Sequence, residues 1–329
     1  MKDFLMISIV LSFFATSFLA GQIIEPEKHT SLTIDVTNRT ANGKATVNDE
    51  VSVSIYEQQK LIQTLRGNVD SEGKAVFENV TTGNNITALP RVKHQNMMFN
   101  GHLIALRTGQ ITFNGHVDVF EVSTDKSELS VTTHHFIIKL EADVLRIVEY
   151  MQLNNSSDMA ITSDEKDDND KDKVIEVFLP KGFKNLFCSR YFQQNALVIT
   201  KDGFYDTMAI PPGQFDADFS YTLEIDSDTI DIVKKIGLPT SDFTVFSLLE
   251  KGSVKGLGDP EGQIKLTDGS LAEYYSFPPI KSGEQIKLQL SGFHVKQSNS
   301  TVLITLIVVF ALMALLVIRR LLSQKSYNI

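Results

Sequence analysis

Short runs in which apolar and polar residues alternate recur along the chain from residue 31 onward. In "SLTIDVTN" (31–38) the apolar residues Leu32, Ile34 and Val36 alternate with polar ones, and "EVSVSIYE" (50–57) repeats the pattern. A period of two residues is that of a β-strand with one buried face. Glycine, asparagine and aspartate separate such runs about every 8–12 residues, a spacing typical of an all-β sandwich rather than of alternating strands and helices. The pattern therefore predicts a mainly β fold.

Length and composition add the number of domains and exclude one class of partner. With 329 residues, the chain has room for about two domains of roughly 150 residues each. Phenylalanine is abundant, at 21 residues, which favours strands. The net charge of -9 argues against a nucleic-acid-binding surface, because such a surface requires a basic face. We therefore expect two β-sandwich domains, and no nucleic acid as partner.

The first 21 residues have the layout of a secretory signal peptide. An apolar run from Phe4 to Ala20 follows Lys2 and ends in small residues. Asp3 offsets the charge of Lys2, and Phe18 is bulky for its position before a cleavage site. Both cleavage and retention as an N-terminal anchor therefore stay open. Either outcome directs the chain out of the cytoplasm.

A second apolar segment lies near the C-terminus. The run from Val302 to Ile318 contains no charged residue, and about 17–25 such residues span a bilayer. Basic residues follow at once, beginning with Arg319, so the positive-inside rule predicts that the tail is cytoplasmic. We expect a transmembrane helix over residues 301–322, a cytoplasmic tail over 323–329, and a single-pass protein whose bulk is periplasmic or on the cell surface.

Cysteine usage narrows the setting of the extracytoplasmic part. Cys188 is the only cysteine in the sequence, so an intramolecular disulfide is excluded. Animal ectodomains of this size usually carry disulfides, whereas bacterial envelope proteins often carry none. We interpret the chain as a bacterial envelope protein, with Cys188 either a small buried apolar residue or a free thiol near a loop.

The strand pattern divides the extracytoplasmic part into two regions. We expect one sandwich over residues 30–124 and a second over 127–294. An acidic run, "SDEKDDNDKDK", lies between strand patterns of the second region, so we interpret residues 156–173 as a long loop within that domain. The segment "DTIDIVKKIG" (228–237) fits both a short helix and a strand.

The acidic run begins like a calcium-binding loop. Asp168, Asp170 and Asp172 have the alternate spacing of the first ligands of such a loop. However, Lys173 stands where that motif has a glycine, and Leu179 stands where it has a bidentate glutamate. These three aspartates are therefore a weak calcium candidate, and we expect a solvated, disordered loop instead.

No motif of a catalytic or cofactor site is found elsewhere. His134 and His135 are adjacent, so on a strand they point to opposite faces and cannot hold one metal ion together. The sequence has no His-Glu-x-x-His motif, no Gly-x-Ser-x-Gly motif and no Lys-Ser/Thr after a glycine-rich loop. We expect no cofactor, no metal and no enzymatic activity.

The stretch "NVDSEGKAVFENV" (68–80) has two interpretations. In one it is a functional loop in which Asp70, Glu72 and Glu78 supply carboxylates for a metal or for acid–base chemistry. In the other it is a β-hairpin: Asp70 accepts hydrogen bonds from nearby backbone amides, Gly73 takes a positive φ, and Phe77 fills the core. The second interpretation is favoured, and in it Asp70, Gly73 and Phe77 are structural residues of the hairpin.

This stretch also carries a resemblance to a known family. Asp70, Gly73, Phe77 and Val80 match the Asp-x-x-Gly-x-x-x-Phe-x-x-Val block of the carboxypeptidase-regulatory-like (transthyretin-like) domains, and Gly83 fits the turn that follows. The resemblance covers roughly residues 31–122. It implies a two-sheet sandwich of the immunoglobulin or transthyretin-like type. It implies no peptidase activity, because this domain accompanies separate catalytic domains elsewhere. The second region more loosely resembles the companion region of uncharacterised bacterial envelope proteins, in segments such as "VFLPKGFKNL" and "IPPGQFDADFSYTLEI".

Together these features predict a non-catalytic binding or assembly module that is anchored in a membrane by its C-terminal helix. Sheet edges and loop tips are the expected contact surfaces, and another envelope protein is the expected partner. In "HQNMMFNG", residues 97–99 are either an exposed apolar patch or a hairpin whose apolar residues cover the core. The alternative function is a surface adhesive protein that binds glycans or calcium. No small-molecule ligand is identified.

Overall fold

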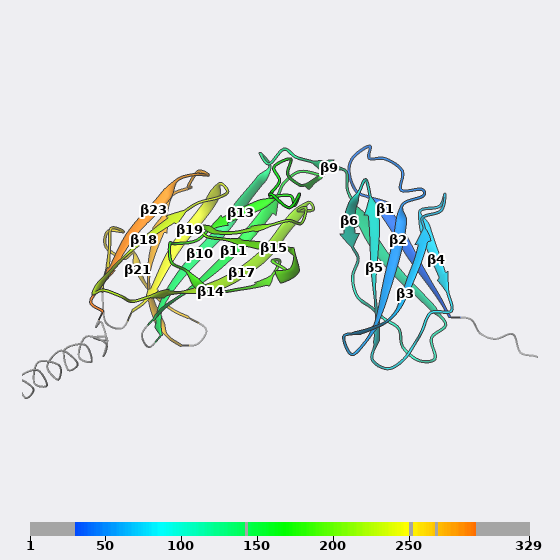
Figure 1. Ribbon diagram of the computed structural model, residues 1–329, viewed down its shortest axis with the longest axis horizontal. Coiled ribbons are helices and arrows are strands. Elements are labelled where there is room, and N and C mark those ends of the chain that lie inside the picture. Colours follow the sequence, from blue (N-terminus) through cyan, green and yellow to red (C-terminus); the bar gives the residue numbers. More distant parts are fainter. Residues whose placement is uncertain (1–29, 142–143, 250–252, 267–268, 294–329) are drawn as a thin grey trace, which may run out of the picture.

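The computed structural model describes residues 30–293 except 142–143, 250–252 and 267–268. The protein is mainly β, with 60% of the structure in strands and 1% helical, as the alternating pattern predicts. The expected signal peptide (1–21), transmembrane helix (301–322) and tail (323–329) lie outside the described residues. Within the described ranges, no helix is long and apolar enough to cross a membrane. The strands form two units that lie side by side (Figure 1).

The N-terminal unit consists of two facing sheets. One has the strand order β4-β1-β8, and the other has the order β3-β2-β5-β6 with β7 paired to β5. β1 pairs in parallel with β8 and antiparallel with β4. The strands are β1 (Ser31–Asn38), β2 (Glu50–Glu57), β3 (Lys60–Asn68), β4 (Lys74–Glu78), β5 (Ile86–His94), β6 (Met97–Asn100), β7 (Ile104–Ala105) and β8 (Thr112–Val119).

Alternation along these strands builds the core of the N-terminal unit. Leu32 and Ile34 on β1 are fully buried, as are Val51 and Val53 on β2 in the opposite sheet. The intervening polar residues face outward, since each strand points successive side chains to opposite faces. The two sheets enclose one apolar cluster, and this arrangement is consistent with a β-sandwich.

The turn before β4 has the contacts that the sequence assigns to it. Asp70 Oδ1 accepts hydrogen bonds from the backbone amides of Glu72 (2.8 Å) and Lys74 (2.9 Å). Gly73 has a φ of +80°, which only glycine adopts without strain. The side chain of Phe77 on β4 points into the core and is 6% exposed.

The C-terminal unit is built on a seven-stranded sheet with the order β14-β17-β11-β10-β19-β22-β21. Two three-stranded sheets, β13-β16-β15 and β18-β23-β20, contribute to the same apolar cluster as this sheet. The elements are β10 (Leu129–Glu141), β11 (Val144–Asn155), β13 (Ile175–Phe178), β14 (Lys184–Arg190), the 3-10 helix η1 (Gln194–Ala196), β15 (Leu197–Thr200), β16 (Gly203–Asp206), β17 (Gly213–Glu224), β18 (Thr229–Lys235), β19 (Thr240–Leu248), β20 (Ser253–Lys255), β21 (Gly262–Lys265), β22 (Leu271–Phe277) and β23 (Gln285–Ser291).

The segment that fitted both a helix and a strand is strand β18. Its pairing with β23 is continuous over the whole strand. Ile232 and Lys234 point inward, at 0% and 2% exposure, whereas Val233 between them is 41% exposed. A lysine therefore occupies an inward position in an otherwise apolar row.

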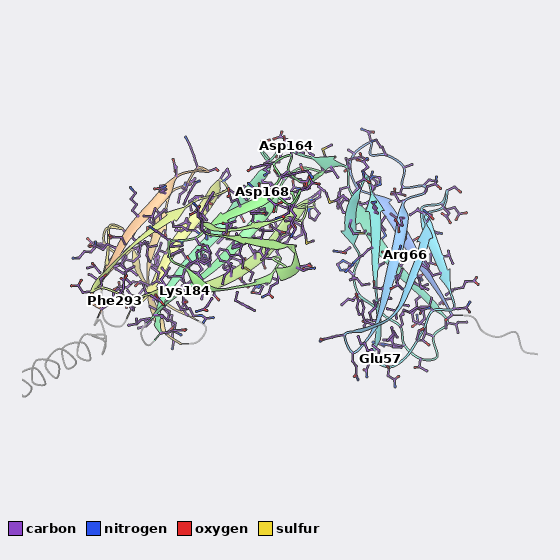
Figure 2. All side chains as sticks on the ribbon, viewed as in Figure 1. Glu57, Arg66, Asp164, Asp168, Lys184 and Phe293 are labelled. Carbon is purple, nitrogen blue, oxygen red and sulfur yellow. The ribbon has the colours of Figure 1, made fainter. Side chains whose placement is uncertain are left out.

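The acidic loop, which was expected to be solvated and disordered, contains short elements and tight turns. It contains β12 (Ala160–Ile161) and an isolated bridge between Lys166 and Asp172. Asp167 Oδ1 accepts hydrogen bonds from the backbone amides of Asn169 and Lys171, both at 2.8 Å, and so closes a tight turn. Local hydrogen bonds and interspersed lysines thus offset the repulsion among the carboxylates. Figure 2 places Asp164 and Asp168 at the end of the C-terminal unit that lies near the N-terminal unit.

This loop also joins the two units. β9 (Val122–Ser123), which follows the N-terminal unit, pairs in parallel with β12. The backbone amide of Ala160 donates to the carbonyl oxygen of Glu121 (2.8 Å), and Ala160 packs in the core cluster of the N-terminal unit. The two units are therefore connected by a short sheet as well as by the chain itself.

Candidate functional site

A cleft of about 360 Å³ lies between the two units. This volume is at the lower end of the range of about 300–1,000 Å³ that is usual for ligand pockets. The wall from the N-terminal unit is formed by residues of β6, β8 and the chain that follows each strand. The wall from the C-terminal unit is formed by Tyr191, Phe215 and the segment 208–212. Residues about 100 positions apart in the sequence are therefore brought together.

The lining of the cleft is rich in methionine and aromatic side chains. Gln95 and Asn96, with φ of 48° and 67°, form the two-residue turn that returns the chain from β5 to β6. That turn places Met97, Met98 and Phe99 at the cleft. Phe99 is buried and Met98 is 48% exposed. The two interpretations of this stretch thus apply to different residues, because Phe99 completes the core while Met98 remains at the surface.

One side of the cleft is polar. His116 and Asp118 lie on the outward face of β8, and the Nε2 atom of His116 is 2.7 Å from Asp118 Oδ1. Arg39 Nε donates to the same oxygen at 2.6 Å. Burial opposes ionisation of Asp118, but hydrogen bonds from His116 and Arg39 outweigh it and lower the pKa of the carboxyl group. The cleft therefore presents a carboxylate next to its apolar wall.

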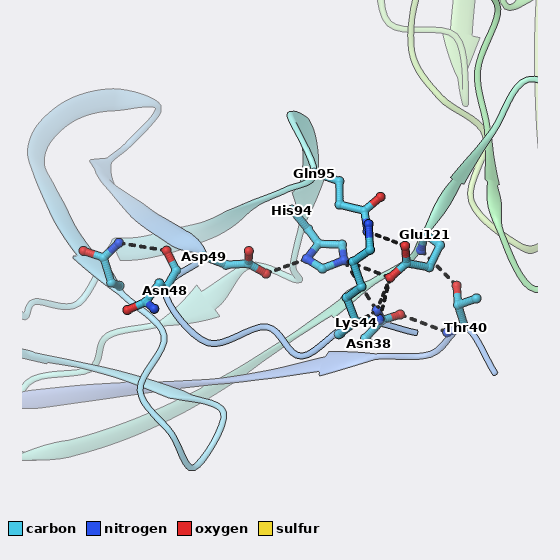
Figure 3. Close-up of polar contacts among 9 residues, drawn as sticks. Asn38, Thr40, Lys44, Asn48, Asp49, His94, Gln95 and Glu121 are labelled. Atoms are coloured by element: carbon cyan, nitrogen blue, oxygen red, sulfur yellow. Dashed lines mark hydrogen bonds and ion pairs between the residues drawn. The ribbon is translucent and has the colours of Figure 1, made fainter. Parts of the chain in front are cut away.

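A polar cluster lies at the end of the N-terminal unit (Figure 3). His94 is 2% exposed, and its Nδ1 atom is 2.6 Å from Asp49 Oδ2. Glu121 Oε1 accepts hydrogen bonds from the Lys44 backbone amide (2.7 Å) and from Asn38 Nδ2 (2.9 Å). Burial opposes ionisation of Glu121, but these hydrogen bonds and one from the Gln95 side chain lower the pKa of Glu121 to about 2. Glu121 is therefore ionised at neutral pH.

The same cluster continues into the C-terminal unit. The backbone amide of Glu121 donates to Thr40 Oγ1 (2.9 Å), and this hydroxyl donates to the carbonyl oxygen of Asp158 (2.7 Å). The Ala41 amide donates to Asp158 Oδ2 (2.9 Å). Hydrogen bonds therefore cross the junction between the two units at several points.

The calcium candidate does not form a ligand cluster. Lys166 Nζ lies 3.2 Å from Asp170 Oδ1 and 3.2 Å from Asp172 Oδ1, so an ammonium group already neutralises these carboxylates. In the described part of the chain, no group of three or more His, Cys, Asp or Glu residues, and so none that includes Asp168, could hold a metal ion.

The two adjacent histidines lie on opposite faces of their sheet, and the single cysteine is buried. His134 is buried and its Nε2 atom is 2.7 Å from Glu149 Oε2, whereas His135 packs against Tyr150 on the other face of the sheet. Cys188 is buried on β14. Burial raises the pKa of the Cys188 thiol to about 12, so this thiol is not a reactive thiolate at neutral pH.

The carboxylates of the 68–80 hairpin do not converge. Asp70 accepts the backbone amides of its own turn, and Glu72 and Glu78 are exposed. The interpretation of this stretch as a functional loop therefore finds no support in its geometry.

Two polar residues beside the cleft were not singled out from the sequence. Asp206 Oδ2 and the Tyr191 hydroxyl are buried and have no hydrogen-bond partner within the described part of the chain. Burial raises the pKa of Asp206 to about 6 and raises the pKa of Tyr191 strongly. The Asp206 side chain reaches the cleft wall through Oδ1, which accepts the Met208 amide at 3.0 Å. A sequence signal exists, because Asp206 ends the apolar strand "GFYD".

This burial makes stability depend on pH in a defined direction. The folded protein holds the Asp206 proton up to about pH 6, whereas an unfolded aspartate loses it near pH 4. The folded state thus binds more protons between these values, and stability falls as the pH rises through them. Asp206→Asn removes the charge but keeps an oxygen for the Met208 amide. We expect the variant to be more stable than wild type at pH 7.5, by up to about 3 kcal/mol, and nearly equal to it at pH 4.

Urea unfolding of both proteins at the two pH values measures this difference. Asp202→Asn is the matched control, because Asp202 is an exposed residue close by in the same hairpin. A stability difference that does not change between pH 4 and pH 7.5 would contradict the assignment of a raised pKa to Asp206.

Comparison with known proteins leaves the family open. No protein-family model matches the chain, and no curated protein matches it by sequence. The resemblance to carboxypeptidase-regulatory-like domains therefore stays a prediction that depends on the residues of the hairpin.

Proposed function

We propose that this protein is a non-catalytic binding module in which two β-sandwiches hold an apolar segment of a partner protein in the cleft between them. In this proposal the N-terminal unit is a carboxypeptidase-regulatory-like sandwich. The apolar run that starts at Val302, followed by Arg319, supports a C-terminal membrane anchor with the body of the chain outside the cytoplasm. The partner is another protein of the bacterial envelope.

The observation that carries the proposal is the lining of the cleft. Met97, Met98 and Phe99 from one unit face Tyr191 and Phe215 from the other. Methionine adapts its shape to different apolar partners, and aromatic residues are enriched in protein interfaces. The partly exposed Met98 is available to an incoming side chain.

The polar side of the cleft fits recognition of a polypeptide. Asp118 is 39% exposed and His116 is 41% exposed, so both can hydrogen-bond to a bound backbone. A histidine beside a carboxylate also occurs in hydrolases, which makes hydrolysis a second candidate. The residues that line this cleft include no serine, threonine or cysteine nucleophile, and Arg39 already binds the carboxylate. Binding is therefore favoured over catalysis.

Met98→Asp tests the proposal. A charge at this position places a carboxylate against the apolar wall, in the same cleft as Asp118. We therefore expect at least a tenfold loss of affinity for the partner, which corresponds to about 1.4 kcal/mol or more, as for a residue that contributes strongly to an interface. Affinity purification of the full-length membrane protein, with quantification of the recovered partner, measures the effect.

Leu271→Asp is the matched control, since Leu271 is a 63% exposed apolar residue on β22 that does not line the cleft. Recovery of the partner should be unchanged by this control. Equal recovery with Met98→Asp and with the control would contradict a role for the cleft.

A further inference from the structure

A lysine and a glutamate lie in direct contact inside the core of the C-terminal unit. Lys234 on β18 is 2% exposed, and Glu149 on β11 is fully buried. Lys234 Nζ is 2.9 Å from Glu149 Oε1 and 2.7 Å from Glu149 Oε2. The two residues belong to opposite layers of the unit and are 85 positions apart in the sequence.

Three further groups contact this pair. The Tyr221 hydroxyl donates to Glu149 Oε1 at 2.8 Å, and His134 Nε2 is 2.7 Å from Glu149 Oε2. Lys234 Nζ also donates to the backbone carbonyl oxygen of Phe178 at 2.8 Å. Each of the atoms that could react is therefore held by a specific partner, and the side chains of Tyr221 and His134 are buried as well.

The surroundings are unfavourable for two charges. Phe219 packs against the Lys234 ammonium group, with 5.6 Å between Nζ and the ring centre. A buried ion pair is costly because both groups lose their water, and an apolar pair of the same volume is often equally stable. Burial lowers the pKa of Lys234 although the Glu149 carboxylate raises it. Burial opposes ionisation of Glu149, but Lys234 and His134 outweigh it and lower the pKa of Glu149. Transfer of a proton from the ammonium group to the carboxylate gives the neutral amine that acts as a nucleophile. An uncharged product of the same two side chains would remove the cost.

We propose that Lys234 and Glu149 condense to an amide, an intramolecular isopeptide bond that joins β18 to β11. Lys234 Nζ forms a bond to the Glu149 carboxyl carbon, and the bond from that carbon to Oε2 breaks. Two protons of the ammonium group pass to Oε2, which leaves as water, and the third stays on the amide nitrogen. The reaction consumes no oxidant, reductant or cofactor.

The neighbouring groups match the needs of this reaction. Tyr221 donates to Oε1, the atom that carries negative charge in the tetrahedral intermediate. His134 contacts Oε2, the leaving oxygen, and can transfer a proton to it. A small cavity of about 10 Å³, lined by both His134 and Lys234, lies beside the pair, and it approaches the space that one water molecule needs.

The product leaves its polar atoms paired. The amide carbonyl retains the hydrogen bond from Tyr221, and the amide N–H keeps the Phe178 carbonyl as acceptor.

The cross-link closes a loop of the chain and joins the two layers of the C-terminal unit. The sequence has a single cysteine and so cannot form an intramolecular disulfide. The isopeptide bond would supply a comparable covalent restraint on the unfolded chain, independently of what the cleft binds.

Peptide mapping of the full-length protein tests the proposal. After protease digestion, we expect the peptides that contain Glu149 and Lys234 to be recovered as one linked species, lighter than their sum by the mass of one water molecule. Lys234→Met should abolish this species. Full recovery of the two peptides as separate, unmodified species from wild-type protein would overturn the proposal.

Tyr221→Phe separates the reaction from general effects on folding. Removing one oxyanion donor should slow formation of the linked species about a hundredfold after synthesis or refolding. Tyr205→Phe is the matched control, because Tyr205 is also buried and its hydroxyl also bonds a carboxylate, Asp167 (2.5 Å). Equal rates of linkage in the two variants would contradict the role assigned to Tyr221.

Discussion

Glu149→Ala is expected to lower the free energy of unfolding of the C-terminal unit by about 3–5 kcal/mol. The substitution leaves Lys234 buried without its carboxylate and removes the acceptor of the Tyr221 hydroxyl. The loss is expected for an ion pair and also for an amide cross-link, since the variant has neither. Because domains are stable by only about 5–15 kcal/mol in total, the change is large. Urea unfolding followed by circular dichroism measures it.

The chain offers an exposed pair as control. Glu224 and Lys184 also form an ion pair, with 2.6 Å between Lys184 Nζ and Glu224 Oε1, but their side chains are 65% and 56% exposed. Exposed pairs contribute about 0–1 kcal/mol, so Glu224→Ala should change stability little. A similarly small effect for Glu149→Ala would contradict the account of the buried cluster.

Phe77→Ala is expected to destabilise the N-terminal unit by about 3–5 kcal/mol, the usual cost of deleting a buried phenylalanine side chain. Phe77 is 6% exposed within the apolar cluster, and a Cβ atom at Gly67 would lie only 3.2 Å from its ring. The surrounding residues are therefore tightly packed, so they cannot close fully around the cavity that the substitution creates. Thermal or urea unfolding measures the change.

Val76→Ala is the control for this prediction, because Val76 precedes Phe77 on the same strand and is 58% exposed. Its effect should stay within about 0.5 kcal/mol, as for most surface substitutions. If both variants lost the same stability, Phe77 would not be a core residue of the hairpin.

Local patterns account for the parts of the fold that the sequence predicts correctly. The burial of Leu32 and Ile34 follows from period-two alternation alone, because one face of β1 is covered by the opposite sheet. The turn at Asp70 and Gly73 follows from the intrinsic conformations of these two residue types. Neither depends on residues far away in the sequence.

The buried charges were missed although the same pattern marks them. Alternation along β11 places Ile147, Glu149 and Met151 on one face, and alternation along β18 places Ile232 and Lys234 on one face. A charged residue in an inward position is therefore visible in each strand. That the two meet is not visible, because their contact depends on how one layer of the unit packs on the other.

The cleft could not be predicted from local pattern either. Met98 was recognised as a candidate contact residue, but Tyr191 and Phe215 belong to the other unit. Their approach to Met98 depends on the pairing of β9 with β12 and on the hydrogen bonds around Glu121. Short strands of two residues and polar contacts between distant loops leave no periodic signal in a sequence.

The most direct test of the binding proposal is photo-crosslinking of the full-length protein in its native membrane. A photoreactive amino acid at position 98 should capture a specific partner, whereas the same amino acid at position 271, another exposed apolar site, should not. Cross-linking from position 98 to one envelope protein, reduced by a second substitution of Phe215 to alanine on the opposite wall, is the predicted result. No cross-linked partner at position 98, or the same partners at both positions, would contradict the assignment of this cleft as the binding site.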